Sequence, residues 1–124
     1  MRFLWVALGG ALGSIARYSV GAWIFGRMGT RFPYGTFVVN ITGCFVIGLV
    51  LTILDTHAEL PSAWRLAVPI GFVGAYTTFS TFEFETYRAA QDRPMIALLY
   101  VVSSVVVGYV AVFLGIQSSK VFLR

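Results

Sequence analysis

The chain has 124 residues, of which 58% are hydrophobic and only 11% are charged, and its formal net charge is +4. Soluble domains carry about 25% charged residues, so this composition excludes an ordinary soluble domain and indicates a protein of the lipid bilayer. The basic residues form no run, which argues against a nucleic-acid partner, and a single cysteine and a single histidine exclude a disulfide framework or a zinc site within one chain.

Hydropathy predicts one all-α membrane domain over residues 1–124, because a span needs about 20 apolar residues. The third of the four expected transmembrane helices is predicted to be broken near mid-membrane, at 74–81. The expected spans are 3–25, 34–54, 64–90 and 95–116.

Small residues recur at helical spacing in the first span. Gly9, Gly13 and Gly21 share one face, which predicts a seam where another helix packs closely. Arg17 lies on the same face, and a cation near the bilayer centre costs at least about 2.5 kcal/mol. A functional or paired role for Arg17 and a side chain that reaches for the nearer interface both stay open.

The second span carries a primary amide, Asn40, in an otherwise apolar sequence. An amide in hydrocarbon must face protein, water or an ion. Asn40 also begins the sequence Asn-Ile-Thr, which matches a glycosylation site, but at membrane depth the match has no meaning.

The third span contains a poor helix, Gly71-Phe-Val-Gly-Ala-Tyr-Thr-Thr-Phe-Ser-Thr-Phe82. Its two glycines raise the entropic cost of a helix, and its four hydroxyl residues compete for backbone hydrogen bonds. Irregular backbone survives at membrane depth only inside protein or beside water, so this stretch is a candidate ion site. An interrupted helix also frees carbonyls for a hard cation such as Na⁺, and Gly74 and Thr77 are the best-placed donors.

The polar side chains at membrane depth are mainly neutral hydrogen-bond donors, which suit an anion better than a cation. They come from Asn40, the hydroxyls of the third span, and Tyr100 and Ser104 of the fourth. Phe79 and Phe82 stand among the hydroxyls, and their ring edges, which are weakly positive, suit an anion as well. Simple core packing of these two rings is the open alternative.

The positive charges are balanced between the two sides of the predicted bundle. Omitting Arg17, four Lys and Arg residues fall on each side, so the usual cytoplasmic excess that sets orientation is missing. We expect dual topology, with two opposed copies meeting about an axis in the membrane plane. A weak bias decided by one arginine or by lipid composition is the alternative. The two groups are Arg2, Arg65, Lys120, Arg124 and Arg27, Arg31, Arg88, Arg93.

Three motifs together resemble the Fluc (CrcB) fluoride channels over essentially the whole chain. They are Gly9-Gly-Ala-Leu-Gly-Ser-Ile-Ala-Arg-Tyr18, Gly35-Thr-Phe-Val-Val-Asn40 and Gly71-Phe-Val-Gly-Ala-Tyr-Thr-Thr-Phe-Ser-Thr-Phe-Glu-Phe-Glu85. The resemblance implies an antiparallel dual-topology homodimer in a bacterial-type inner (plasma) membrane, two fluoride-selective pores, and a structural Na⁺ at the dimer centre. It implies a passive channel through which fluoride leaves the cell.

The resemblance also implies roles for individual residues. The ring edges of Phe79 and Phe82 would face fluoride, with Asn40 contacting the ion path. Backbone carbonyls of Gly74 and Thr77 would hold Na⁺. The remaining positions with implied roles in the pathway or its entrance are Ser80, Thr81, Glu85, Tyr100, Ser104 and Arg17.

Two positions depart from the family pattern. Gly108 stands where some relatives have a second serine after Ser104, and Ala75 stands where a second glycine is common. The methyl group of Ala75 is tolerated if the residue is helical and strains the backbone if a positive φ is required.

Other classes of protein fit the sequence less well. A small proton-coupled multidrug exporter needs a carboxylate within its first span, where this chain has Arg17. A non-transporting assembly subunit explains the glycine seam but not the hydroxyls or Asn40. An enzyme is the poorest fit, because no nucleophile–base pair or set of metal ligands is present.

Overall fold

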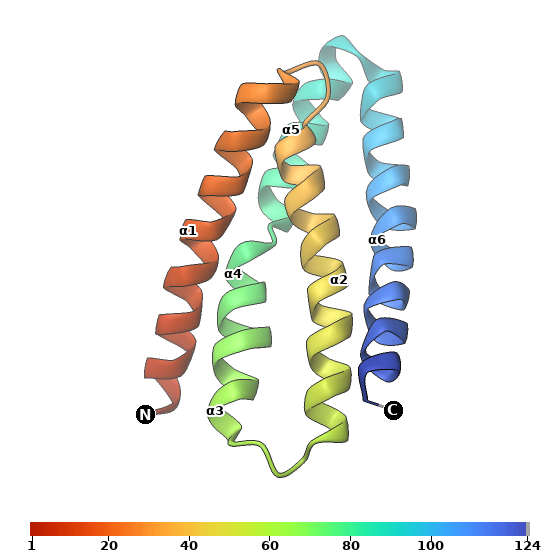
Figure 1. Cartoon of the computed structure of the whole chain (residues 1–124). Helices are drawn as coiled ribbons and strands as arrows, with labels where there is room; N and C mark the ends of the chain where they lie inside the picture. Colours follow the sequence, from red (N-terminus) through yellow and green to blue (C-terminus); the bar gives the residue numbers. More distant parts are fainter. Residues whose placement is uncertain (124) are drawn as a thin grey trace.

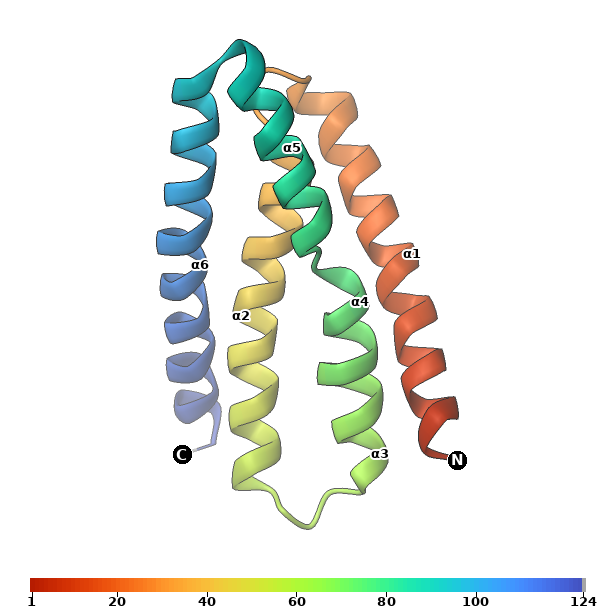
Figure 2. The same cartoon turned by 180° about the vertical axis from the view of Figure 1, so that it is seen from behind.

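The computed structural model describes residues 1–123, and these form an all-helical bundle (Figures 1 and 2). Arg124, which was counted in the charge balance, lies outside the described residues. The elements in chain order are α1 (Arg2–Met28), α2 (Tyr34–Thr56), α3 (Ser62–Arg65), the π-helix η1 (Leu66–Val73), α4 (Gly74–Tyr76), α5 (Phe79–Asp92) and α6 (Pro94–Phe122).

Three helices, α1, α2 and α6, are each long and apolar enough to cross a membrane. The segment from α3 to α5 is built of shorter pieces, and together these run along the bundle beside the long helices (Figure 1). The observed helices extend two or more residues beyond several of the expected ends. The predicted spans stop where polar residues begin, because hydropathy assigns those residues to the membrane interface. The backbone nevertheless stays helical through them.

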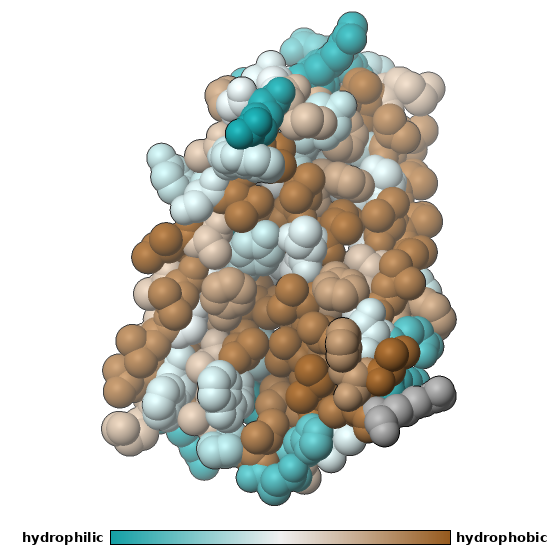
Figure 3. Space-filling model, in the orientation of Figure 1, coloured by the Kyte–Doolittle hydropathy of each residue, from teal (hydrophilic) through white to brown (hydrophobic). Residues whose placement is uncertain are grey.

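The surface in Figure 3 is hydrophobic over its middle and hydrophilic mainly toward its two ends, as a bilayer requires. The start of α1, the end of α6 and the α2–α3 connection lie at one end of the bundle, and the α1–α2 and α5–α6 connections lie at the other (Figure 1). Exposed leucine, valine and phenylalanine side chains cover α1 and α6, so lipid or another apolar surface must meet them.

Helices α2 and α6 pack along a glycine seam that hydropathy alone did not single out. A Cβ atom added to Gly115 would overlap the carbonyl of Phe45, and one added to Gly48 would overlap that of Val112. Backbones approach this closely only where a residue has no side chain. In lipid, where the hydrophobic effect does not drive helices together, such close packing stabilises their association.

Helix α1 packs on η1 through Gly9 and Gly13, both of which are buried. A Cβ atom on Gly13 would overlap the carbonyl of Phe72. Gly21 lies outside this α1–η1 contact, because a Cβ atom there meets nothing within 4 Å. Its backbone is instead approached closely by α2, where an ideal Cβ on Gly35 would lie 3.3 Å from the Gly21 carbonyl oxygen and 3.4 Å from its Cα.

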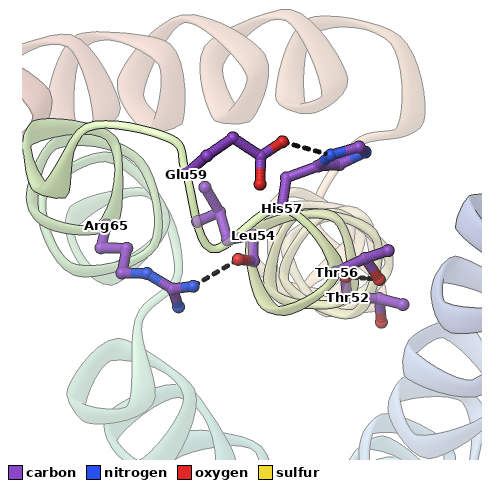
Figure 4. A network of polar contacts seen from close by, with 6 residues as sticks. All are labelled: Thr52, Leu54, Thr56, His57, Glu59 and Arg65. Atoms are coloured by element: carbon purple, nitrogen blue, oxygen red, sulfur yellow. Dashed lines mark hydrogen bonds and ion pairs between the residues drawn. The ribbon is translucent and has the colours of Figure 1, made fainter.

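The α2–α3 connection is fastened by Arg65 (Figure 4). Its guanidinium donates to the Leu54 carbonyl near the C-terminal end of α2 and forms an ion pair of 3.0 Å with Asp55. Beside it, Glu59 accepts a hydrogen bond from its own backbone amide and another from His57 at 2.8 Å, and both lower the pKa of the Glu59 carboxyl. Arg65 therefore ties the start of η1 to the end of α2.

Candidate functional site

The third segment is interrupted at two residues, Thr77 and Thr78. Helix α4 ends at Tyr76, the two threonines have extended backbone, with ψ of 155° and 118°, and α5 begins at Phe79. The expected break at 74–81 was too long. Gly74 is helical, with φ −60° and ψ −34°, because a glycine permits a break without forcing one.

Thr78 starts the second half of the segment immediately. Its hydroxyl oxygen accepts a hydrogen bond from the Thr81 amide at 3.3 Å and lies 3.1 Å from the Thr81 hydroxyl oxygen, to which it donates. An N-cap of this kind is worth about 0.5–2 kcal/mol. Ala75 is helical and no residue other than glycine has a positive φ in the described part of the chain, so its methyl group causes no strain.

Asn40 of α2 holds the interruption from the side. Its Nδ2 donates to the Thr78 carbonyl at 3.0 Å, and its Oδ1 accepts from the Thr78 amide at 2.8 Å. The side chain therefore satisfies both backbone groups of one non-helical residue. One N–H of the amide remains for another acceptor.

The interruption removes the helical donors of the carbonyls in the last turn of the first half, and Gly74 and Thr77 are two of the residues affected. In a continuous helix the Thr78 amide would donate to the carbonyl of Gly74, but here it donates to Asn40. The Thr81 amide would donate to the carbonyl of Thr77, but it donates to the Thr78 side chain. These are the two carbonyls that the sequence nominated as cation ligands.

Three aromatic rings form a connected row beside the interruption. The centroids of Phe79 and Phe82 are 6.0 Å apart, and the Phe82 ring meets Tyr100 edge to face at 4.9 Å and 73°. Tyr100 is fully buried and Phe82 is 7% exposed, whereas Phe79 is 74% exposed in the single chain. Phe32 packs on the other side of Tyr100 at 5.2 Å.

Polar groups continue the row in both directions along the bundle. The Tyr100 hydroxyl lies 3.5 Å from a carboxylate oxygen of Glu85, to which it donates. The Ser104 hydroxyl is buried and has no hydrogen-bond partner among residues 1–123. Ser80 and Thr81 are exposed on the first turn of α5. Gly108, the departure one turn beyond Ser104, is buried with its ideal Cβ 3.4 Å from the Cys44 sulfur, so this position packs against α2.

Two cavities flank the row. The first, which we call the groove, has about 470 Å³ and is lined by Asn40, Gly74, Thr77, Phe79, Phe82 and Ser104 among others. The second, the vestibule, has about 620 Å³, lies where the α1–α2 turn meets α5 and α6, and is lined by Glu85, Arg88 and Arg93 among others. The fold thus gathers the predicted residues of the second, third and fourth spans along one face.

Arg17 of the first span stands apart from this set. Its side chain is half-buried, and no carboxylate of the described chain lies within ion-pair distance of it. It lines neither the groove nor the vestibule.

The sequence did not assign a role to several residues that the structure brings to the site. Thr78 was seen only as one of four hydroxyls, and Tyr76, Thr42 and Phe32 were not considered. The Thr42 and Tyr76 hydroxyl oxygens are 2.8 Å apart and share a hydrogen bond. No local pattern in a single sequence could reveal this pair, because its members are 34 residues apart.

Comparison with known proteins identifies the family of this chain. The family model described as CrcB-like protein, Camphor Resistance (CrcB), matches residues 4–116. The chain belongs to the CrcB family.

Curated CrcB relatives are similar over nearly their whole length. A protein of Acidobacterium capsulatum named "Fluoride-specific ion channel FluC" is 66% identical over 116 residues, which is 93% of each chain. Proteins of the same name from Solibacter usitatus and Chloroflexus aurantiacus are 51% and 42% identical, and each match covers at least 93% of both chains. The CrcB family is one of ion channels and not of enzymes, and this chain is a multi-pass membrane protein of the plasma membrane.

Proposed function

We propose that this chain is a fluoride-selective channel through which fluoride leaves the cell down its electrochemical gradient. The observation that carries the proposal is the buried Ser104 hydroxyl, which lacks a partner in the described chain and lines the same groove as Phe79 and Phe82. A buried polar group without a partner is costly, so an acceptor in the groove is expected, which can be water or an anionic ligand. The names of the relatives give that ligand as fluoride.

The chemistry of the groove favours an anion over a cation. Its lining within residues 1–123 contains hydroxyls, one amide and two phenyl rings but no carboxylate. Fluoride is small and strongly hydrated, and these neutral donors replace its water without holding it as tightly as a fixed positive charge would. The amide of Asn40 has one N–H free for this purpose, and Ser80 and Thr81, which are exposed, extend the set of donors. Beyond Tyr100, Glu85 lines the vestibule, where the path meets water.

The direction of flow follows from the membrane potential and not from the protein. An interior-negative potential favours exit of an anion by about 2.3 kcal/mol per charge for each 100 mV. A passive path is therefore enough to lower the fluoride concentration of the cell.

A structural Na⁺ fits two of the carbonyls that the interruption frees. Gly74 and Thr77 line the groove, and both have lost their helical donors. Sodium is a hard cation that prefers oxygen ligands, and unwound carbonyls at a helix break supply them. The cation would neutralise the exposed end of the first half-helix.

We further propose that two copies associate as an antiparallel homodimer with the interruption of the third span near mid-membrane. The groove is open, and Phe79 beside it is 74% exposed, which suits a surface that a second copy covers. Balanced charges at the two ends of the bundle allow both orientations. In this arrangement the segment from α3 to α5 crosses the membrane as a fourth span.

A proton-coupled multidrug exporter is not favoured. Such a transporter exchanges protons on a carboxylate in its first span, and α1 contains no Asp or Glu.

The test is ion efflux from liposomes that contain the purified, folded protein. We expect efflux of fluoride and no efflux of chloride from the same vesicles. An absence of fluoride efflux in protein shown to be folded would sink the proposal. Replacing Na⁺ by a large organic cation during purification tests the cation site, because loss of Na⁺ is expected to weaken the dimer or reduce flux.

A further inference from the structure

One segment of α2 contacts three consecutive residues at the interruption, Tyr76, Thr77 and Thr78. Asn40 bonds both backbone groups of Thr78, Thr42 shares a hydrogen bond with Tyr76, and Gly43 lies against Thr77. We propose that Asn40, Thr42 and Gly43, which we call the clamp, set the place and the length of the interruption. This inference rests on the proposed function, because the interruption is what frees the cation ligands and starts the anion-facing half of the span.

The first element of the clamp acts on the residue after the break. The Thr78 amide would otherwise return to the carbonyl of Gly74 and continue the helix. Asn40 offers an acceptor for that amide at 2.8 Å and a donor for the Thr78 carbonyl at 3.0 Å. Because both backbone groups are satisfied by one side chain, the extended conformation of Thr78 leaves neither of them without a partner.

The second element acts on the residue before the break. The Thr42 hydroxyl donates to the Val38 carbonyl at 2.7 Å, so its oxygen is free to accept from the Tyr76 hydroxyl at 2.8 Å. Tyr76 is buried and stacks on Phe72, with the ring centroids 5.8 Å apart. The last helical residue is thus fixed through its side chain.

The third element is a matter of space. A Cβ atom on Gly43 would overlap the Cγ2 methyl group of Thr77 and would lie 3.4 Å from the Tyr76 ring. The space left because Gly43 has no side chain is therefore filled by the Cγ2 methyl group of Thr77, the first non-helical residue. Three residues of α2 thus meet three consecutive residues of the interrupted segment.

The clamp gives Asn40 a second role beside its proposed contact with the ion path. In this role it is a positioning residue that acts through Thr78. The sequence Asn-Ile-Thr-Gly, whose first three residues match a glycosylation site, is then a structural motif. Its asparagine and threonine bond to the residues at the break, and its glycine leaves room for the Thr77 methyl group.

The decisive experiment is a steric rescue. We expect Gly43→Ala to lower fluoride flux in liposomes about fivefold or more, because the new methyl group overlaps Thr77 and displaces the interruption. Adding Thr77→Ser removes the Cγ2 methyl group and is expected to restore most of the flux measured for Thr77→Ser alone. Gly26→Ala is the matched control, because a Cβ atom there meets nothing within 4 Å. Where Gly43→Ala gives no folded protein, recovery of folded protein in the double variant replaces flux as the readout.

A second measurement decides the clamp without fluoride. Hydrogen–deuterium exchange of the segment 74–81 reports the Thr78 amide, and Asn40→Ala is expected to make that amide exchange several-fold faster. Unchanged exchange in Asn40→Ala would overturn the clamp, as would a Gly43→Ala variant that conducts normally or that Thr77→Ser does not rescue. An absence of fluoride flux in the wild-type protein would refute the proposed function but not the clamp. The clamp would still be tested by hydrogen–deuterium exchange in Asn40→Ala and by the recovery of folded protein in the double variant.

Discussion

The α1–η1 seam gives a prediction whose size follows from the geometry. In Gly13→Ala the new methyl group would overlap the Phe72 carbonyl oxygen, and it would lie 2.9 Å from the carbonyl carbon. Backbone atoms cannot move aside as a flexible side chain can, so α1 and η1 must separate. Inserting a methyl group into a packed contact costs about 1–3 kcal/mol.

The helix preference of alanine opposes this cost. Alanine is favoured over glycine inside a helix by about 1 kcal/mol, so the net loss for Gly13→Ala is about 0–2 kcal/mol. Gly21→Ala is the matched control, since it makes the same exchange in the same helix but meets nothing within 4 Å. The helix preference cancels in the difference between the two variants, which leaves about 1–3 kcal/mol for the packing contact.

The assay is reversible unfolding of detergent-solubilised protein with increasing sodium dodecyl sulfate, followed by tryptophan fluorescence. We expect Gly13→Ala to unfold at lower denaturant than the wild type, and Gly21→Ala at the same or higher denaturant. Equal unfolding free energies for the two variants, within about 0.5 kcal/mol, would contradict the packing described here.

Three other predictions concern the aromatic row and the α2–α3 connection. Phe79→Ile and Phe82→Ile are both expected to lower fluoride flux in liposomes because they remove the ring edges, and normal flux in both would refute the ring-edge role. Only Phe82→Ile should also lower the unfolding free energy, by about 0.5–1.5 kcal/mol, since it alone breaks a buried aromatic pair. Arg65→Ala is expected to cost about 1 kcal/mol by denaturant titration because a helix-end carbonyl loses its donor, whereas Asp55→Asn should cost less than about 0.5 kcal/mol because that ion pair is exposed; equal costs would argue against the carbonyl contact. The pKa of Glu59 is lower in the folded than in the unfolded protein, so its ionised carboxyl stabilises the fold at pH above the unfolded-state pKa, and this contribution is lost as pH falls through the folded-state pKa. We therefore expect the difference in unfolding midpoint between wild type and Glu59→Gln to shrink as pH falls below about 4, and a constant difference would count against the contact.

The sequence was a good guide wherever a feature depends on local composition or spacing. Hydropathy located the three long helices to within a few residues at most ends. The helical spacing of Gly9 and Gly13 indicated the face on which α1 packs, because residues four apart lie on one side of a helix. The motifs of the third span located the interruption approximately, since hydroxyl side chains and glycines weaken a helix wherever they cluster.

The sequence was a poor guide to the partner of each polar group. Asn40 was expected to face protein, water or an ion because an amide in hydrocarbon needs a partner, but composition cannot say that one partner is the backbone of Thr78. For the same reason the predicted break was too long, and the helix that meets Gly21 was not named. In both cases the outcome depends on a residue of α2, which no periodicity within the first or third span can reveal.

Sequence alone therefore determined that this protein lies in the membrane as long helices and that its third span is weak around 74–81. A helix in lipid must satisfy its own backbone, so apolar length and helix-breaking residues are enough to decide both points. Only the tertiary structure decided which two residues leave the helix, because Thr78 is satisfied by a side chain 38 positions away. It also decided which carbonyls are freed at the groove, since those follow from where the amide of Thr78 is directed.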